Sequence, residues 1–95
     1  MKPSPCRMVM VFTNPRHNNG ADTAPAVITR VWSDTLINVR VLHDGPSQAP
    51  EGRIDWVTSV PLFDSREAAE AAHAEKWAHA DHEMPVFAAF WPPRV

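Results

Sequence analysis

Two arginines, a tryptophan and an asparagine recur at alternate positions of two β-branched segments. Arg30 and Trp32 belong to the first segment, and Asn38 and Arg40 belong to the second. Side chains two residues apart in a strand point to the same side, so these four share one face of the expected sheet. Guanidinium groups bind phosphate or carboxylate through paired hydrogen bonds, and an indole ring stacks on planar groups. The pattern predicts a surface for a partner or a planar anion, although outward arginines are also ordinary on a solvated hairpin.

A second set of polar side chains lies in the segment 15–25, between two prolines. His17 and Asn19 stand there, and Asn19-Gly20 is a pair that readily adopts positive φ. The segment is long for a hairpin connection, and long loops often carry function. We therefore predict His17 and Asn19 as further contact residues.

Three residues towards the C-terminal end have the spacing of metal ligands. On a helix, Glu75, His79 and His82 would span only about 60° of the circumference. The exposed face of an alanine-rich helix collects such residues by chance, and we expect a solvated face there. The prediction is no metal and no cofactor, with these three residues kept as a weak candidate.

The chain has few of the residues and motifs that nucleophilic catalysis requires. Cys6 is the single cysteine, with no histidine or acid near it in sequence, and one thiol forms no internal disulfide. There is no G-x-S-x-G turn, and three glycines leave little room for a phosphate-binding or dinucleotide loop. We predict a protein that is not an enzyme.

Composition excludes several other classes. The 95 residues suit one domain, since two cores of half that size would be too small to hold together. The net charge of −2 argues against a dedicated nucleic-acid binder, which usually has a basic excess. No apolar run is long enough to span a bilayer, so we expect no membrane partner.

The elements that position these residues are mainly strands. Segments 7–12, 26–32, 36–42 and 54–62 predict strands. Pro61 lacks a backbone donor, so the end of the last strand should lie on a sheet edge or leave the sheet. The second and third should pair as a hairpin with Trp32 opposite Leu36. In that register one face holds only apolar residues and a threonine: Val27, Thr29, Val31, Ile37, Val39 and Val41. We expect Trp56 to lie in the core. Trp32 and Trp91 are each either a core residue or a contact residue.

A helix from Ser65 to about His82 is expected to follow, with Asp64 as N-cap. Its buried stripe is predicted from the spacing of four residues, Ala71, Ala74, Trp77 and Ala78, with Trp77 supplying most of the buried area. Met84-Pro85 ends the helix, and the aromatic segment 85–95 should be extended and covered.

The predicted fold is α+β and mainly β, in a single domain over residues 1–95. It is a small bent antiparallel sheet or an SH3-like, partly open barrel of four or five strands. The β part covers about 6–63, one C-terminal helix covers about 65–82, and an extended aromatic tail covers 85–95. The aromatic tail and an edge strand favour a homodimer.

Several phrases together are similar to small uncharacterised proteins of bacteriophages and prophages. They are segments 26–34, 37–41 with Asp44-Gly45, 58–61, and the closing 91–95 (AVITRVWSD, INVRV, TSVP, WPPRV). The resemblance implies a phage-encoded protein in the cytoplasm of the infected bacterial host, or in the virion. The favoured function is a non-enzymatic interaction module acting on a host protein or host defence. The alternatives are a virion accessory protein of the head or tail, and a sponge for a small anionic nucleotide-like ligand held by Arg30, Trp32 and Arg40.

Overall fold

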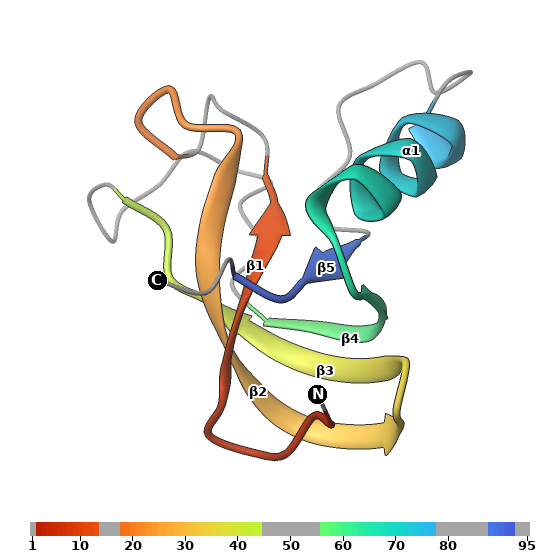
Figure 1. The fold of residues 1–95 in the computed structure, drawn as a ribbon. Helices are drawn as coiled ribbons and strands as arrows, with labels where there is room; N and C mark the ends of the chain where they lie inside the picture. The colour runs from red at the N-terminus through yellow and green to blue at the C-terminus, as the bar shows by residue number, and fades with distance from the viewer. Residues whose placement is uncertain (1, 14–17, 45–55, 78–87, 93–95) are drawn as a thin grey trace.

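Five strands close into a barrel in the computed structural model, which describes residues 2–13, 18–44, 56–77 and 88–92. The strands are β1 (Met8–Phe12), β2 (Thr23–Ser33), β3 (Leu36–Val41), β4 (Trp56–Phe63) and β5 (Ala89–Phe90). Figure 1 shows β2 bending, so that its first half lies beside β1 and its second half beside β3. The mainly-β, small-barrel prediction is confirmed, and the barrel is closed rather than partly open.

β5 completes the barrel because it pairs with strands on both of its sides. It runs antiparallel to β1, with Val11 opposite Ala89, and parallel to β4, with Leu62 opposite Ala89. A parallel neighbour requires a crossover connection, and the single described helix, α1 (Arg66–Trp77), lies on that crossover. The predicted C-terminal helix therefore precedes the strand that closes the barrel.

Three bulges interrupt the hairpins and bend the strands. On β2, Thr29 and Trp32 are each an extra residue relative to β3, and on β4 the pair Thr58–Ser59 stands opposite the single residue Asn38. Ser59 has a φ of 59°, the left-handed conformation that such a bulge requires. Bulges increase local twist, which lets a short meander curl into a barrel.

The bulges also correct the predicted hairpin register. Val31 faces Ile37 as expected, but Val39 faces Ile28 and Val27 faces Arg40. The predicted pairs of Thr29 with Val39 and Val27 with Val41 are wrong by one residue, because an uninterrupted two-residue period does not allow for the extra residue at Thr29. Ile28 is buried and Thr29 is exposed as a result.

Pro61 lies within β4, opposite Leu36 of β3. The amide of Leu62 donates to the carbonyl of Thr35 on the β3 side, at 2.9 Å. Because amides alternate along a strand, the nitrogen of Pro61 faces the other side, where β4 pairs with β5 only from Leu62 onward. The missing donor thus falls on a locally unpaired side of β4, although β4 is paired on both sides from Leu62 and is not the expected edge strand.

The N-cap of α1 is Ser65 and not the predicted Asp64. The hydroxyl of Ser65 accepts a hydrogen bond from the amide of Ala68 at 3.2 Å, as an N-cap side chain does for the third helical residue. Asp64 is exposed one residue earlier. The helix starts at Arg66, and the predicted end near His82 lies outside the described residues.

The predicted buried stripe of α1 is also wrong. Ala71 and Ala74 are exposed, whereas Ala69 is fully buried and Ala72 and His73 are half-buried. The side chain of Trp77, like Ala78, lies outside the described residues. Because alanines occupy many positions of this helix, several stripes were equally apolar, and the contact with the barrel selected another one.

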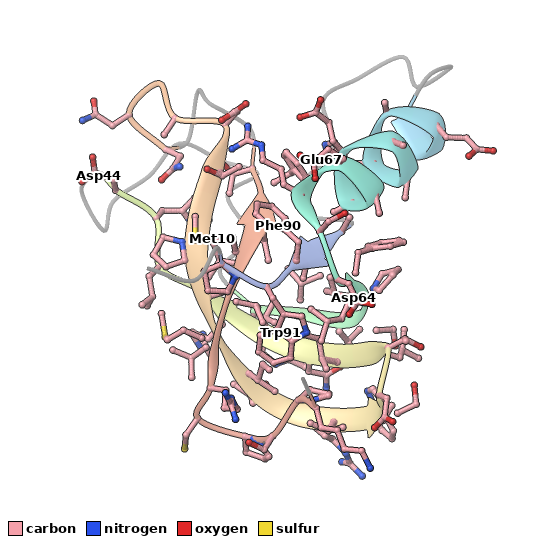
Figure 2. All side chains as sticks on the ribbon, viewed as in Figure 1. Met10, Asp44, Asp64, Glu67, Phe90 and Trp91 are labelled. Carbon is pink, nitrogen blue, oxygen red and sulfur yellow. The ribbon has the colours of Figure 1, made fainter. Side chains whose placement is uncertain are left out.

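The buried residues form two clusters. The barrel interior contains Val9, Val11, Ala24, Ala26, Ile28, Ile37, Val39, Val41, Val60, Leu62, Ala89 and Trp91. The second cluster lies where α1 meets the barrel and contains Phe12, Ala69, Ala88 and Phe90, with Met10 and Phe63 against it. Figure 2 shows the neighbours Phe90 and Trp91 on opposite sides of the β5 segment, one towards α1 and one towards β3.

The burial of the tryptophans differs from the prediction. Trp91 is a core residue, 9% exposed, with the guanidinium carbon of Arg7 5.6 Å from its ring centroid. Trp56, expected in the core, is 46% exposed, and Trp32 is 50% exposed. Burial of Phe90 and Trp91 in their own barrel confirms that this part of the tail is covered. It also removes one reason for expecting a homodimer, which stays a prediction.

Candidate functional site

Asn38 is the centre of a hydrogen-bond network on the outside of the barrel. It lies on the outward side of β3, between the inward residues Ile37 and Val39, yet it is only 6% exposed. Its side-chain oxygen accepts three hydrogen bonds, from the indole nitrogen of Trp32 at 2.8 Å, the hydroxyl of Thr58 at 2.8 Å and the amide of Ser59 at 2.9 Å. All three donors belong to the β2 and β4 bulges. Asn38 therefore ties three strands together where their ladders are interrupted.

This network fixes the orientation of Trp32. The indole N–H is held by Asn38, while half of the side-chain surface remains exposed. The guanidinium carbon of Arg30 stands 4.1 Å from the ring centroid, which is close stacking of a cation on an indole. Arg30 is the cross-strand partner of Asn38, so both share the outward side. The structure thus brings together three of the four predicted residues.

Arg40 is the fourth predicted residue, and it lies in a neighbouring row. It is opposite Val27 on one side and Trp56 on the other, and Val27 is opposite Met8 on β1. Paired residues of a ladder point to the same side, so this row crosses four strands on the outside of the barrel. Trp56 and Met8 are largely exposed at or near its ends.

We call the combined surface the tryptophan face and define it by Arg30, Trp32, Asn38, Arg40 and Trp56. Arg40 follows Asn38 by two residues on β3, a separation of about 7 Å along the strand. Exposed Met8 and Leu42 flank the face. Within the described part of the chain, no carboxylate is within ion-pair distance of Arg30 or Arg40.

Trp56 is the residue of this face that the sequence reasoning missed. The expected alternation put Trp56 on the same side as Val60 and Leu62, which are buried. The bulge at Thr58–Ser59 shifts the alternation by one residue, so that Trp56 points outward while Val57 points to the core. A Thr-Ser pair inside an apolar strand is only a weak indication of such a bulge.

The loop that was predicted as a second contact site is organised by a residue that was not singled out. Asn18 is 1% exposed, and its amide group donates to Thr13 and to the carbonyls of Ala21 and Thr23 at 2.9–3.2 Å. Its side-chain oxygen accepts from the amide of Asp44 at 2.6 Å. Asn18 therefore joins the loop before β2 to the segment after β3.

Asn19 of the same loop has a structural contact of its own. It adopts a φ of 51° and is exposed, and its amide nitrogen donates to a carboxylate oxygen of Asp44 at 3.3 Å. His17, the other predicted residue, lies outside the described residues. The loop lies beyond the C-terminal end of β3, and no described hydrogen bond joins Asn19 to a residue of the tryptophan face.

The metal candidate cannot be assembled from the described residues alone. Glu75 is exposed on α1, and His79 and His82 lie outside the described part. Among the residues that the structure describes, no three His, Cys, Asp or Glu side chains are grouped to hold a metal ion.

His73 of α1 has a different role, in the contact between helix and barrel. Its ring stacks on Phe12, with centroids 5.2 Å apart and planes at 28°. Burial lowers the pKa of His73 from its ordinary value, because the charged imidazolium loses hydration there.

Arg66 lies over the same aromatic residue. Its guanidinium carbon is 5.7 Å from the Phe12 centroid, and it forms exposed ion pairs at 3.7 Å with Asp22 and Glu70. Unlike Arg30 and Arg40, this arginine has acidic partners within its own chain. It therefore offers a matched control for experiments on the tryptophan face.

In the described part of the chain, no helix has both the length and the apolar character needed to cross a membrane. Comparison with protein-family models, with curated proteins and with solved structures finds no match for this chain.

Proposed function

We propose that the chain is a phage-encoded, non-enzymatic interaction module that binds a protein of the infected bacterial host through the tryptophan face. The observation that carries the proposal is the exposure of two indoles on one side of a closed barrel, one of them fixed by Asn38. A soluble domain hides most of its large aromatic surface, and exposed tryptophan is characteristic of binding hot spots.

The rigidity of the face supports this role. Trp32 donates to Asn38, and Arg30 is stacked on Trp32, so these side chains have already lost much of their rotational freedom. Binding through an ordered surface avoids the entropic cost of fixing rotamers in the complex. A module that blocks a host protein by surface complementarity would benefit from this order.

The sponge for a small planar anion is supported less well. Such a ligand would stack on Trp32, but the guanidinium of Arg30 already stands over that ring at 4.1 Å. Arg40 lies in the neighbouring row and shares no described contact with Trp32. A planar ligand would have to displace Arg30 before stacking.

The test is capture of a partner followed by measurement with the purified pair. The chain is immobilised and exposed to a lysate of phage-infected host cells, and the retained proteins are identified by mass spectrometry. The purified partner is then titrated against the wild-type chain, Trp56→Ser and the control Glu67→Ser on the exposed side of α1. We expect Trp56→Ser to weaken binding about tenfold or more, and Glu67→Ser to leave it unchanged.

Two results would overturn the proposal. One is a partner that binds Trp56→Ser as tightly as the wild-type chain. The other is co-purification of the chain with assembled phage particles, with no host protein bound saturably, which would assign it to the virion.

A further inference from the structure

We propose that the tryptophan face recognises an acidic, extended protein segment that carries apolar side chains between its carboxylates. This inference rests on the proposed function and specifies the chemistry of the partner. It starts from a contrast among three of the exposed arginines, Arg30, Arg40 and Arg66. Arg66 has Asp22 and Glu70 beside it, whereas Arg30 and Arg40 have no carboxylate within ion-pair distance in the described part of the chain.

Arg30 and Arg40 are the only charged residues of β2 and β3. Arg30 and Arg40 contribute +2 to a net charge of −2, so all other residues together sum to −4. No acidic residue occurs in β2 or β3, the strands that carry the two arginines. An acidic segment would be attracted to these two arginines, while the net negative charge of the other residues opposes its binding elsewhere.

The spacing of the arginines fits an extended segment. Arg30 is opposite Asn38, about 5 Å away across the ladder, and Arg40 follows Asn38 about 7 Å along β3. The two Cα atoms are therefore about 8–9 Å apart. Carboxylates on alternate residues of an extended chain are about 7 Å apart, close enough for flexible arginine side chains to reach both.

The surface around the arginines is apolar and favours apolar side chains on the partner. Trp56 is opposite Arg40, Met8 lies in the same row across β2, and Leu42 follows Arg40 by two residues. Apolar side chains such as these gain free energy by packing against apolar side chains of a protein. A nucleic acid could stack a base on Trp56, but it offers Met8 and Leu42 no aliphatic surface, and two arginines neutralise few phosphates.

A second copy of the chain fits this face poorly. In a symmetric dimer the same patch meets itself, so one interface would contain Arg30 and Arg40 of both copies and no acidic residue of the patch. Like charges in such an interface oppose association. The favoured occupant is therefore a different, acidic segment.

The experiment uses the full chain and four fluorescent probes. The first is a peptide of about twelve residues in which Asp or Glu alternates with Leu or Phe, and the second has Lys at each acidic position. The third is an acidic peptide with Ser in place of the apolar residues, and the fourth is a single-stranded oligothymidylate of similar length. Fluorescence anisotropy is measured for the wild-type chain, Arg40→Glu, Arg30→Glu and the control Arg66→Gln.

We expect the acidic-apolar peptide to bind most tightly, and both glutamate variants to weaken it about tenfold or more while Arg66→Gln has no effect. Raising salt from about 50 mM to about 500 mM should also weaken it. Equal binding of the lysine peptide, stronger binding of the oligothymidylate, or no effect of Arg40→Glu and Arg30→Glu would overturn the inference. Self-association of the labelled chain through the same residues would overturn it as well.

The same variants separate this inference from the proposed function. One outcome is a purified host partner that binds saturably and needs Trp56, while its affinity is insensitive to Arg30→Glu, Arg40→Glu and salt. In that case the proposed interaction module stands and the acidic-segment inference is wrong. If no partner needs Trp56, both are wrong.

Discussion

Removing the acceptor at Asn38 should destabilise the barrel far more than removing one of its donors. In Asn38→Leu the number and branching of the side-chain heavy atoms are kept, but Trp32, Thr58 and Ser59 lose the oxygen to which they donate. All three hydrogen bonds are part-buried although the donor residues are exposed, so water replaces the lost oxygen incompletely, at about 0.5–1.5 kcal/mol for each bond.

The expected total loss is about 2–4 kcal/mol of unfolding free energy, a large share of the roughly 5–15 kcal/mol of a typical domain. For a domain of this size that corresponds to a fall in Tm of about 10–25 °C. The assay is urea unfolding followed by far-ultraviolet circular dichroism. The matched control is Thr58→Val, which removes one donor and leaves the acceptor, and should cost no more than about 1 kcal/mol.

A loss below about 1 kcal/mol for Asn38→Leu, or a loss equal to that of Thr58→Val, would refute the reasoning. Either result would mean that the bulges are held by backbone twist and packing, and that the side-chain oxygen of Asn38 merely occupies the space between them.

Three further expectations concern the helix and the core. Ser65→Ala should cost about 1 kcal/mol of unfolding free energy and Asp64→Ala much less, and the reverse order in urea unfolding would contradict the N-cap assignment. Because burial lowers the pKa of His73, the imidazole of the unfolded chain is protonated at a higher pH than that of the folded chain. The free energy of unfolding should therefore be highest above about pH 6.5 and should fall as the pH drops through the pKa of the folded state. His73→Phe should flatten that dependence, and an unchanged slope would sink the explanation. Trp91→Ala should cost at least about 3 kcal/mol or prevent folding, whereas Trp32→Ala should cost far less, and similar losses would dispute their different burial.

The sequence predicts β3 well because nothing interrupts its alternation. Ile37, Val39 and Val41 point inward and are buried, while Arg40 points outward, as a two-residue period requires. The presence of strands in β1, β2 and β4 follows equally from their apolar and β-branched content. These are local properties, which a single sequence contains.

The orientation of residues beyond a bulge is not a local property. The extra residues at Thr29 and Trp32 reverse the sides of β2, and Thr58–Ser59 does the same to Trp56. Asn38 forms hydrogen bonds to the bulges at Trp32 and at Thr58–Ser59, and it lies 20 or 21 positions from its partners on β4. Arg30, Trp32 and Asn38 were found because they cluster across one hairpin, and Trp56 was missed because its side depends on a distant residue.

The buried face of α1 shows a second limit. Its many alanines give the helix little amphipathic contrast, so the sequence pattern alone did not distinguish Ala69 and His73 from Ala71 and Ala74. The ring of Phe12, from the other end of the domain, selects the stripe by stacking on His73.

The short β5 strand has a consequence for the order in which the chain folds. Val11 and Ala89 lie opposite each other although almost the whole domain separates them in the chain, so their pairing carries a large loop-closure entropy. The β2–β3–β4 meander joins near neighbours and can form without β5. During synthesis the first four strands should therefore wait as an open, curved sheet, with the site of Trp91 empty, until residues 88–91 have left the ribosome.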